Sequence, residues 1–99
     1  MTPEGNFKAA LRSELKLLFP GCVITKNDAG SVQGIPDMSI FYNGKYAWLE
    51  TKREHNASKR PNQAYYIQKC NADGAYASFC YPENKKEVLT ELINYFNDI

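Results

Sequence analysis

The fold of this chain is decided by residues 37–52, which read DMSIFYNGKYAWLETK. Two runs of strand-like composition, 37–42 and 45–53, are separated only by the dipeptide Asn43-Gly44. That dipeptide is typical of a type I′ hairpin turn, because both of its positions need a positive φ. The sequence therefore predicts a tight antiparallel hairpin at the centre of the fold.

The two-residue turn also predicts the pairing register of the hairpin. Tyr42 faces Lys45, and in each further pair the residue number falls by one on the first strand and rises by one on the second. Asp37 therefore faces Glu50. Directly opposed side chains have Cβ atoms roughly 4.5–5.5 Å apart. Lys52 follows Glu50 by two residues and therefore points to the same face. Unless a β-bulge shifts the register, the hairpin gathers two acids and a lysine.

The segments around the hairpin predict an α/β domain with the element order α-β-β-β-α-β-α. Thr2 and Pro3 are typical of a helix start, and Gly74 is typical of a helix end. We expect a central mixed four-stranded sheet flanked by helices, all within one domain, 1–99. The predicted elements are a helix from Thr2 to Pro20-Gly21, a strand at 22–26, strands at 37–42 and 45–53, a helix from Pro61 to Gly74, a strand at 75–81 and a helix beginning at 82–84.

Composition and charge restrict the function classes. With 43% hydrophobic and 23% charged residues, the 99-residue chain can form one core and is not of disordered composition. The net charge of +1 provides no overall basic field for nucleic acid. A DNA contact must therefore come from a local patch, and the candidates are Arg53, Lys59 and Arg60, beside Lys52.

The cysteines and the hydropathy pattern bear on location. The three cysteines are odd in number and lack metal-site spacing, which predicts free thiols in a reducing compartment. The sequence shows no signal peptide and no apolar run as long as a membrane span. We expect a cytoplasmic protein without membrane contact.

Two acids that face each other need a compensating charge or a shared proton. Mg²⁺ and Mn²⁺ prefer carboxylate, carbonyl and water oxygens, so Asp37, Glu50 and the backbone carbonyl of Thr51 are candidate metal ligands. Lys52 would then orient or deprotonate a water, or offset charge on a phosphate. The alternative is a surface hairpin in which Asp37 caps a turn and Glu50 pairs with Lys52.

Three further residues are weaker candidates for the same site. Glu4 and Glu14 both project near the apolar stripe of the first predicted helix, and either can supply an additional carboxylate. The alternatives are helix-start electrostatics for Glu4 and an ion pair at the rim of the core for Glu14. Gln63, in the first turn of the second helix, can bond to a water, to Lys52 or to a phosphate, or it can lie on ordinary helix surface.

These residues resemble the virus-type replication-repair nuclease (VRR-NUC) domain of the PD-(D/E)xK nuclease superfamily. The resemblance begins at Glu4, runs through GIPD at 34–37, WLETK at 48–52 and RPNQ at 60–63, and ends with the strand after Gly74. It implies a restriction-endonuclease-like core and an endodeoxyribonuclease that needs Mg²⁺, for which Mn²⁺ can substitute. No organic cofactor is implied.

The resemblance also assigns roles to individual residues. Asp37 and Glu50 match the metal-binding acids, Lys52 matches the catalytic lysine, and Gln63 matches the glutamine after the catalytic strand. Glu4 matches the acid of the first helix, and Glu14 stays open as its alternative. Thr51 departs from the pattern, because family members more often have an apolar residue there.

Stand-alone domains of this kind are typically encoded by bacteriophages and look like Holliday-junction resolvases that act as homodimers in DNA repair and recombination. The expected substrate is therefore branched DNA, cut by a symmetric pair of subunits. Three alternatives stay open: a flap nuclease or less selective nickase, a DNA-binding module without catalysis, and a plain interaction domain.

Overall fold

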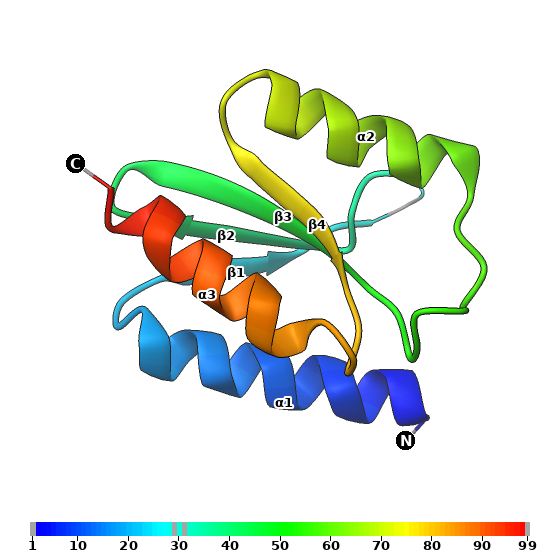
Figure 1. Cartoon of the computed structure of the whole chain (residues 1–99), viewed down its shortest axis with the longest axis horizontal. Coiled ribbons are helices and arrows are strands. Elements are labelled where there is room, and N and C mark those ends of the chain that lie inside the picture. The colour runs from blue at the N-terminus through cyan, green and yellow to red at the C-terminus, as the bar shows by residue number, and fades with distance from the viewer. Residues whose placement is uncertain (1, 29, 31, 99) are drawn as a thin grey trace.

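The computed structural model describes residues 2–28, 30 and 32–98, and the elements follow in the predicted order (Figure 1). The strands are one or two residues shorter than predicted at their ends, and β2 begins at Met38 rather than Asp37. The elements are α1 (Pro3–Leu18), β1 (Val23–Lys26), β2 (Met38–Tyr42), β3 (Lys45–Thr51), α2 (Pro61–Ala72), β4 (Tyr76–Cys80) and α3 (Lys85–Phe96).

The central hairpin forms as the sequence predicts. Asn43 and Gly44 have φ angles of 53° and 74°, the two positive values that a type I′ turn requires. The register runs from Tyr42 opposite Lys45 to Met38 opposite Leu49, so the predicted register is confirmed. In the sheet order β1-β2-β3-β4, only the β3–β4 pair is parallel, which makes the sheet mixed.

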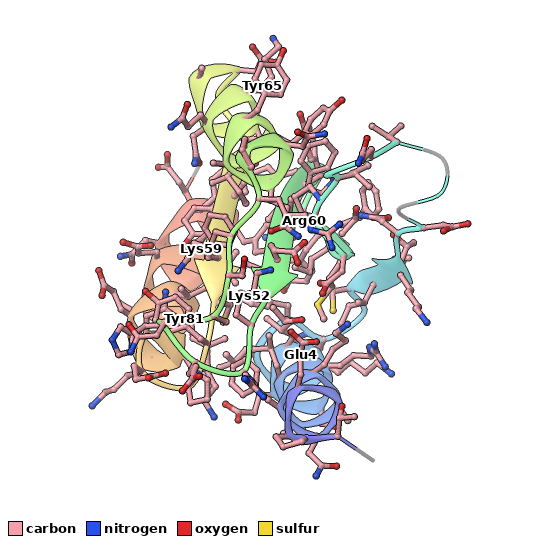
Figure 2. The ribbon with its side chains drawn as sticks, turned by 90° about the vertical axis from the view of Figure 1, so that its right-hand side faces the viewer. Glu4, Lys52, Lys59, Arg60, Tyr65 and Tyr81 are labelled. Carbon is pink, nitrogen blue, oxygen red and sulfur yellow. The ribbon has the colours of Figure 1, made fainter. Side chains whose placement is uncertain are left out.

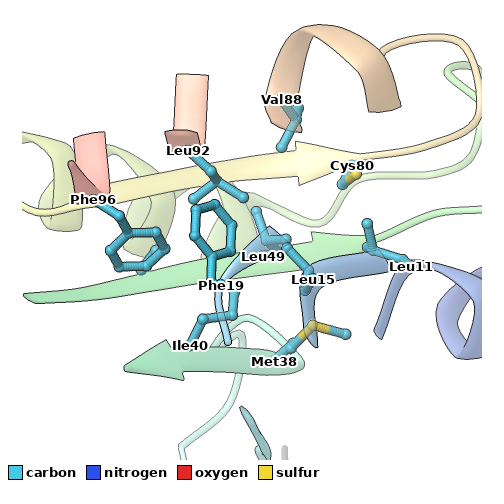
Figure 3. Close-up of a cluster of buried hydrophobic side chains, with 11 residues drawn as sticks. Leu11, Leu15, Phe19, Met38, Ile40, Leu49, Cys80, Val88, Leu92 and Phe96 are labelled. Atoms are coloured by element: carbon cyan, nitrogen blue, oxygen red, sulfur yellow. The ribbon is translucent and has the colours of Figure 1, made fainter. Parts of the chain in front are cut away.

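Helices cover both faces of the sheet, with α1 and α3 on one face and α2 on the other (Figure 1). The core lies between the sheet and the pair α1 and α3, because alternate residues of β2 and β3 point to that side (Figure 3). Each large aliphatic or aromatic side chain buried there contributes about 1.5–3 kcal/mol. The core residues are Leu11, Leu15, Phe19, Met38, Ile40, Ala47, Leu49, Cys80, Val88, Leu92 and Phe96.

Two helices are fixed in positions that matter for the site. The hydroxyl oxygen of Thr2 accepts a hydrogen bond from the Gly5 N–H at 3.0 Å, which confirms the predicted cap of α1. On the opposite face, the Asn71 amide joins α2 to β4 by exchanging two hydrogen bonds of 2.9 Å with the Ala77 backbone. The first turns of both helices lie near the end of β3, since Glu4 of α1 lines a hollow with Lys52 and Gln63 of α2 accepts a hydrogen bond from Lys52.

The remaining sequence predictions concern cysteines and membranes. Cys22, Cys70 and Cys80 are free thiols, as predicted, and the last two are buried. Within residues 2–28, 30 and 32–98, no helix is both long and apolar enough to cross a membrane.

Candidate active site

The segment Gly34-Ile35-Pro36-Asp37 brings the chain to the site under tight local restraint. Gly34 has a φ of +91°, and a Cβ there would lie 2.3 Å from the Asn62 Cβ in the first turn of α2. Pro36 is buried, and its carbonyl accepts a hydrogen bond from the Asn27 side-chain amide at 2.9 Å. The Asn27 N–H donates to the Asp37 carbonyl at 2.9 Å. Asp37 is thus held just before the start of β2.

Asp37 lies beyond the last β2–β3 pair, which corrects its predicted place as the first residue of the strand. Its N–H donates to Glu50 Oε1 at 3.1 Å, so the two acids are neighbours. Since no pair of the ladder holds Asp37, strand alternation does not determine where its carboxylate points. The Oδ2 atom accepts a hydrogen bond from the Thr51 hydroxyl at 2.7 Å and lies 3.1 Å from Lys8 Nζ of α1.

Glu50 is a buried carboxylate with a high proton affinity. Only 6% of the residue is exposed. Burial, assisted by the negative charge of Asp37, raises the pKa of Glu50 to about 7, although the Lys52 ammonium opposes the shift. Lys52 Nζ lies 3.7 Å from Glu50 Oε2, the ion pair that the surface-hairpin alternative predicts. Glu50 can thus accept a proton or a cation near neutral pH.

Gln63 joins the acid and the lysine. Its side-chain N–H₂ donates to Glu50 Oε2 at 3.2 Å, and its Oε1 accepts from Lys52 Nζ at 3.0 Å. The same oxygen accepts from the Arg60 N–H at 3.2 Å, which ties the side chain to the start of α2. The structure therefore brings Glu50, Lys52 and Gln63 together, whereas an ordinary surface position would leave Gln63 in water.

Hollows open on both sides of this group. A cavity of about 360 Å³ is lined by Asp37, Glu50, Gln63 and Arg60, among others. A shallower hollow of about 470 Å³ is lined by Glu4, Lys52 and Arg53, among others, and Figure 2 shows Glu4 at the start of α1 near Lys52. The two acids and Gln63 thus line one hollow, and Lys52 lines the other.

The first helix offers its two acids to different neighbours. Glu4 lines the hollow beside Lys52, on the side of the candidate site. Glu14 Oε1 lies 2.6 Å from Lys85 Nζ of α3, the rim ion pair that the sequence offered as the alternative for this residue. Both ligand roles stay predictions, and the position of Glu4 is the more favourable one.

The basic residues predicted to bind DNA, Arg53, Lys59 and Arg60, are all exposed. Arg60 lines the 360 Å³ cavity beside Asp37 and Glu50, and Arg53 lines the 470 Å³ hollow beside Lys52. Lys59 donates to the His55 carbonyl at 2.7 Å, and its Nζ lies 5.5 Å from the ring centroids of both Phe79 and Tyr81 (Figure 2). Lys59 is therefore engaged with β4 and the following turn, while Arg60 faces the site.

The donor set fits a hard divalent cation. In the described part of the chain, no three His, Cys, Asp or Glu side chains gather into a metal-binding group. Mg²⁺ commonly binds through one or two carboxylates, keeps several waters and takes further oxygens from substrate phosphates. Asp37 and Glu50, with the predicted Thr51 carbonyl, supply oxygen donors of that kind, and Mn²⁺ accepts the same ligands.

Two contacts of Asp37 were not anticipated from the sequence. Lys8 reaches Asp37 from α1, and its only sequence signal is its place one turn after Glu4 on the same helix face. The Thr51 hydroxyl had no signal, because strand alternation assigns it to the face opposite Glu50. Both contacts exist because Asp37 lies at the end of a strand, within reach of both faces.

Comparison with protein-family models and with curated proteins finds no match. Among solved structures, a "VRR_NUC domain" superposes with a TM-score of 0.77 and 21% identity, over 92% of this chain and 97% of that one. This chain has the VRR_NUC fold. A second structure, titled "VRR_NUC domain protein", has a TM-score of 0.71 and 16% identity, over 99% of this chain and 93% of the other. The predicted restriction-endonuclease-like VRR_NUC core is thereby confirmed.

Proposed function

We propose that this chain is a metal-dependent endodeoxyribonuclease that hydrolyses phosphodiester bonds in branched DNA. The observation that carries the proposal is the buried Glu50 carboxylate, which neighbours Asp37 and is joined through Gln63 to Lys52. A fold gains little by burying such a carboxylate beside another acid, unless a cation or proton joins them. The VRR_NUC fold supports the same conclusion.

The two acids hold the cation in this proposal, together with the Thr51 carbonyl. When bound, Mg²⁺ or Mn²⁺ polarises a phosphoryl oxygen and lowers the pKa of a bound water. Lys52 adds a positive charge beside the phosphate, where it offsets charge that develops in the transition state. Gln63 positions the Lys52 ammonium, because its side-chain oxygen accepts a hydrogen bond from Lys52 while its side-chain N–H₂ donates to Glu50.

The DNA strand approaches through the openings that flank the acids. Arg60 lines one opening and Arg53 the other, so each can contact a phosphate on its own side of the cut. With a net charge of +1, the chain holds DNA through these local contacts rather than a general field.

The proposed substrate is a four-way junction, cut by a homodimer. A two-fold pair of subunits offers two sites for the two cuts that resolution requires. An exposed apolar surface is available for pairing between α1 and α3, where Leu17, Leu18 and Ile93 are 82%, 42% and 38% exposed. Exposed apolar surface of this kind commonly marks an interaction site.

The test compares a synthetic four-way junction with a linear duplex and a flap of the same arm sequences. Each DNA is incubated with the protein in Mg²⁺, in Mn²⁺ and in chelator. We expect paired, symmetric nicks in the junction, with either metal and not in chelator. Cleavage of the flap alone would keep the site and change the substrate, while binding without cleavage would indicate a DNA-binding module. Cleavage in chelator would contradict the proposed chemistry.

A further inference from the structure

The Asp37 carboxylate is already paired with a cation supplied by the chain. Lys8 Nζ lies 3.1 Å from Asp37 Oδ2, and the two side chains are only 25% and 22% exposed. Water screens such a pair less than it screens an exposed ion pair. The same oxygen accepts a hydrogen bond from the Thr51 hydroxyl at 2.7 Å, so Oδ2 is contacted by groups from both α1 and β3.

A divalent cation that binds Asp37 Oδ2 would compete with Lys8 for that oxygen, which Lys8 Nζ approaches to 3.1 Å. Mg²⁺ binds its oxygen ligands at about 2.0–2.1 Å, and an ammonium beside the same oxygen would be strongly repelled. Lysine has a flexible four-carbon stem, so Lys8 can turn away from Asp37 while α1 stays in place. The Thr51 hydroxyl carries no charge, and it can keep its hydrogen bond when a metal binds.

We propose that Lys8 occupies the position beside Asp37 that a metal ion would take. It competes with the metal for that carboxylate and leaves it when the metal binds. The inference rests on the proposed metal site. Lys8 then supplies a compensating positive charge beside the two acids whenever the site holds no metal. Thr51 has the opposite effect on the metal, because it orients Asp37 without opposing a cation.

The two contacts therefore predict changes of opposite sign in metal affinity. Removing Lys8 deletes a competitor and should tighten binding, whereas removing the Thr51 hydroxyl should loosen it. A purely structural role for Lys8 predicts no tightening. A role for Lys8 in orienting Asp37 predicts weaker binding, as in Thr51→Val.

The experiment is a Mn²⁺ titration of the full chain without DNA, followed by calorimetry or by the spin resonance of free Mn²⁺. Lys8→Met should bind Mn²⁺ roughly fivefold more tightly than wild type, the equivalent of about 1 kcal/mol. Lys16→Met, which removes an exposed positive charge further along α1, should bind as wild type does. Thr51→Val should bind more weakly, and Asp37→Asn should not bind at this site.

Thermal unfolding gives a second readout of the same competition. In chelator, Lys8→Met should unfold at a lower temperature than wild type, because Asp37 has lost its partner. The increase in unfolding temperature that saturating Mn²⁺ produces should be larger in Lys8→Met than in wild type, since tighter binding stabilises the folded state more.

The outcomes distinguish the role of Lys8 from the metal site itself. Mn²⁺ binding that is lost in Asp37→Asn but equal in wild type and Lys8→Met would overturn the role of Lys8 and leave the metal site standing. Weaker binding in Lys8→Met would do the same. If wild type binds no Mn²⁺, both the metal site and the role of Lys8 are wrong.

Discussion

Replacing Glu50 with glutamine should change how the stability of the metal-free protein depends on pH. Burial and the charge of Asp37 raise the pKa of Glu50 from 4.5 to about 7 in the folded state. Between these values the folded chain binds a proton that the unfolded chain has lost. The free energy of unfolding therefore falls as pH rises through this range, because unfolding releases the proton.

The size of this effect follows from the shift itself. A pKa raised from 4.5 to about 7 corresponds to about 3 kcal/mol of stability, present below pH 4.5 and lost as pH rises through about 7. Glu50 is 6% exposed, so little of this is screened by water. Glutamine cannot ionise, so the unfolding free energy of Glu50→Gln should not fall as the pH rises through this range.

The assay is urea unfolding at pH 5 and pH 8.5 in chelator, followed by the fluorescence of Trp48, the only tryptophan. The difference between Glu50→Gln and wild type should grow by roughly 2–3 kcal/mol in favour of the variant at the higher pH. Glu87→Gln, an exposed change on α3, should show no such growth. A difference that is equal at both pH values would show that Glu50 does not lose a proton between pH 5 and 8.5 in the folded protein.

Three further predictions follow from the surroundings of the site. Gly34→Ala should lower stability by about 1–3 kcal/mol and slow cleavage, because the new methyl group strains φ and meets α2; Gly21→Ala shares only the φ strain, so equal unfolding energies would contradict this. Gln63→Ala should lower the single-turnover cleavage rate at least about tenfold with little change in DNA affinity. An unchanged rate would show that Lys52 does not need Gln63 to orient it. Lys59→Ala with Arg60→Ala should flatten the salt dependence of DNA binding by about 0.9 per lost phosphate contact, and an unchanged slope would place the contacts elsewhere.

The hairpin shows how much of the fold a local pattern can predict. Asn43-Gly44 needs no tertiary information, because positive φ at both positions selects the turn and the turn selects the register. The order of helices and strands also followed from caps, prolines and glycines. Strand ends were less predictable, because they depend on where the partner strand stops. Asp37 left the ladder for that reason.

Only the part of the site that depends on the register of the hairpin could be predicted from the sequence. Neighbouring positions for Asp37 and Glu50 followed from strand pairing, and the bond from Lys52 to Gln63 was one of several that the sequence left open. The Lys8 contact depends on how α1 packs against the sheet end, which no local pattern encodes. Lys59 was predicted as a DNA contact, and its position over two aromatic rings depends on the path of the loop.

In the proposed mechanism, Asp37 and Glu50 together support metal-dependent cleavage of a phosphodiester. The most direct test is the single-turnover rate of junction nicking in Mg²⁺ for wild type and Asp37→Asn, at protein concentrations where both bind the junction fully. We predict nicking by wild type, and loss of nicking in the variant with junction binding and folding retained. Equal nicking by both proteins would show that cleavage does not depend on the Asp37 carboxylate.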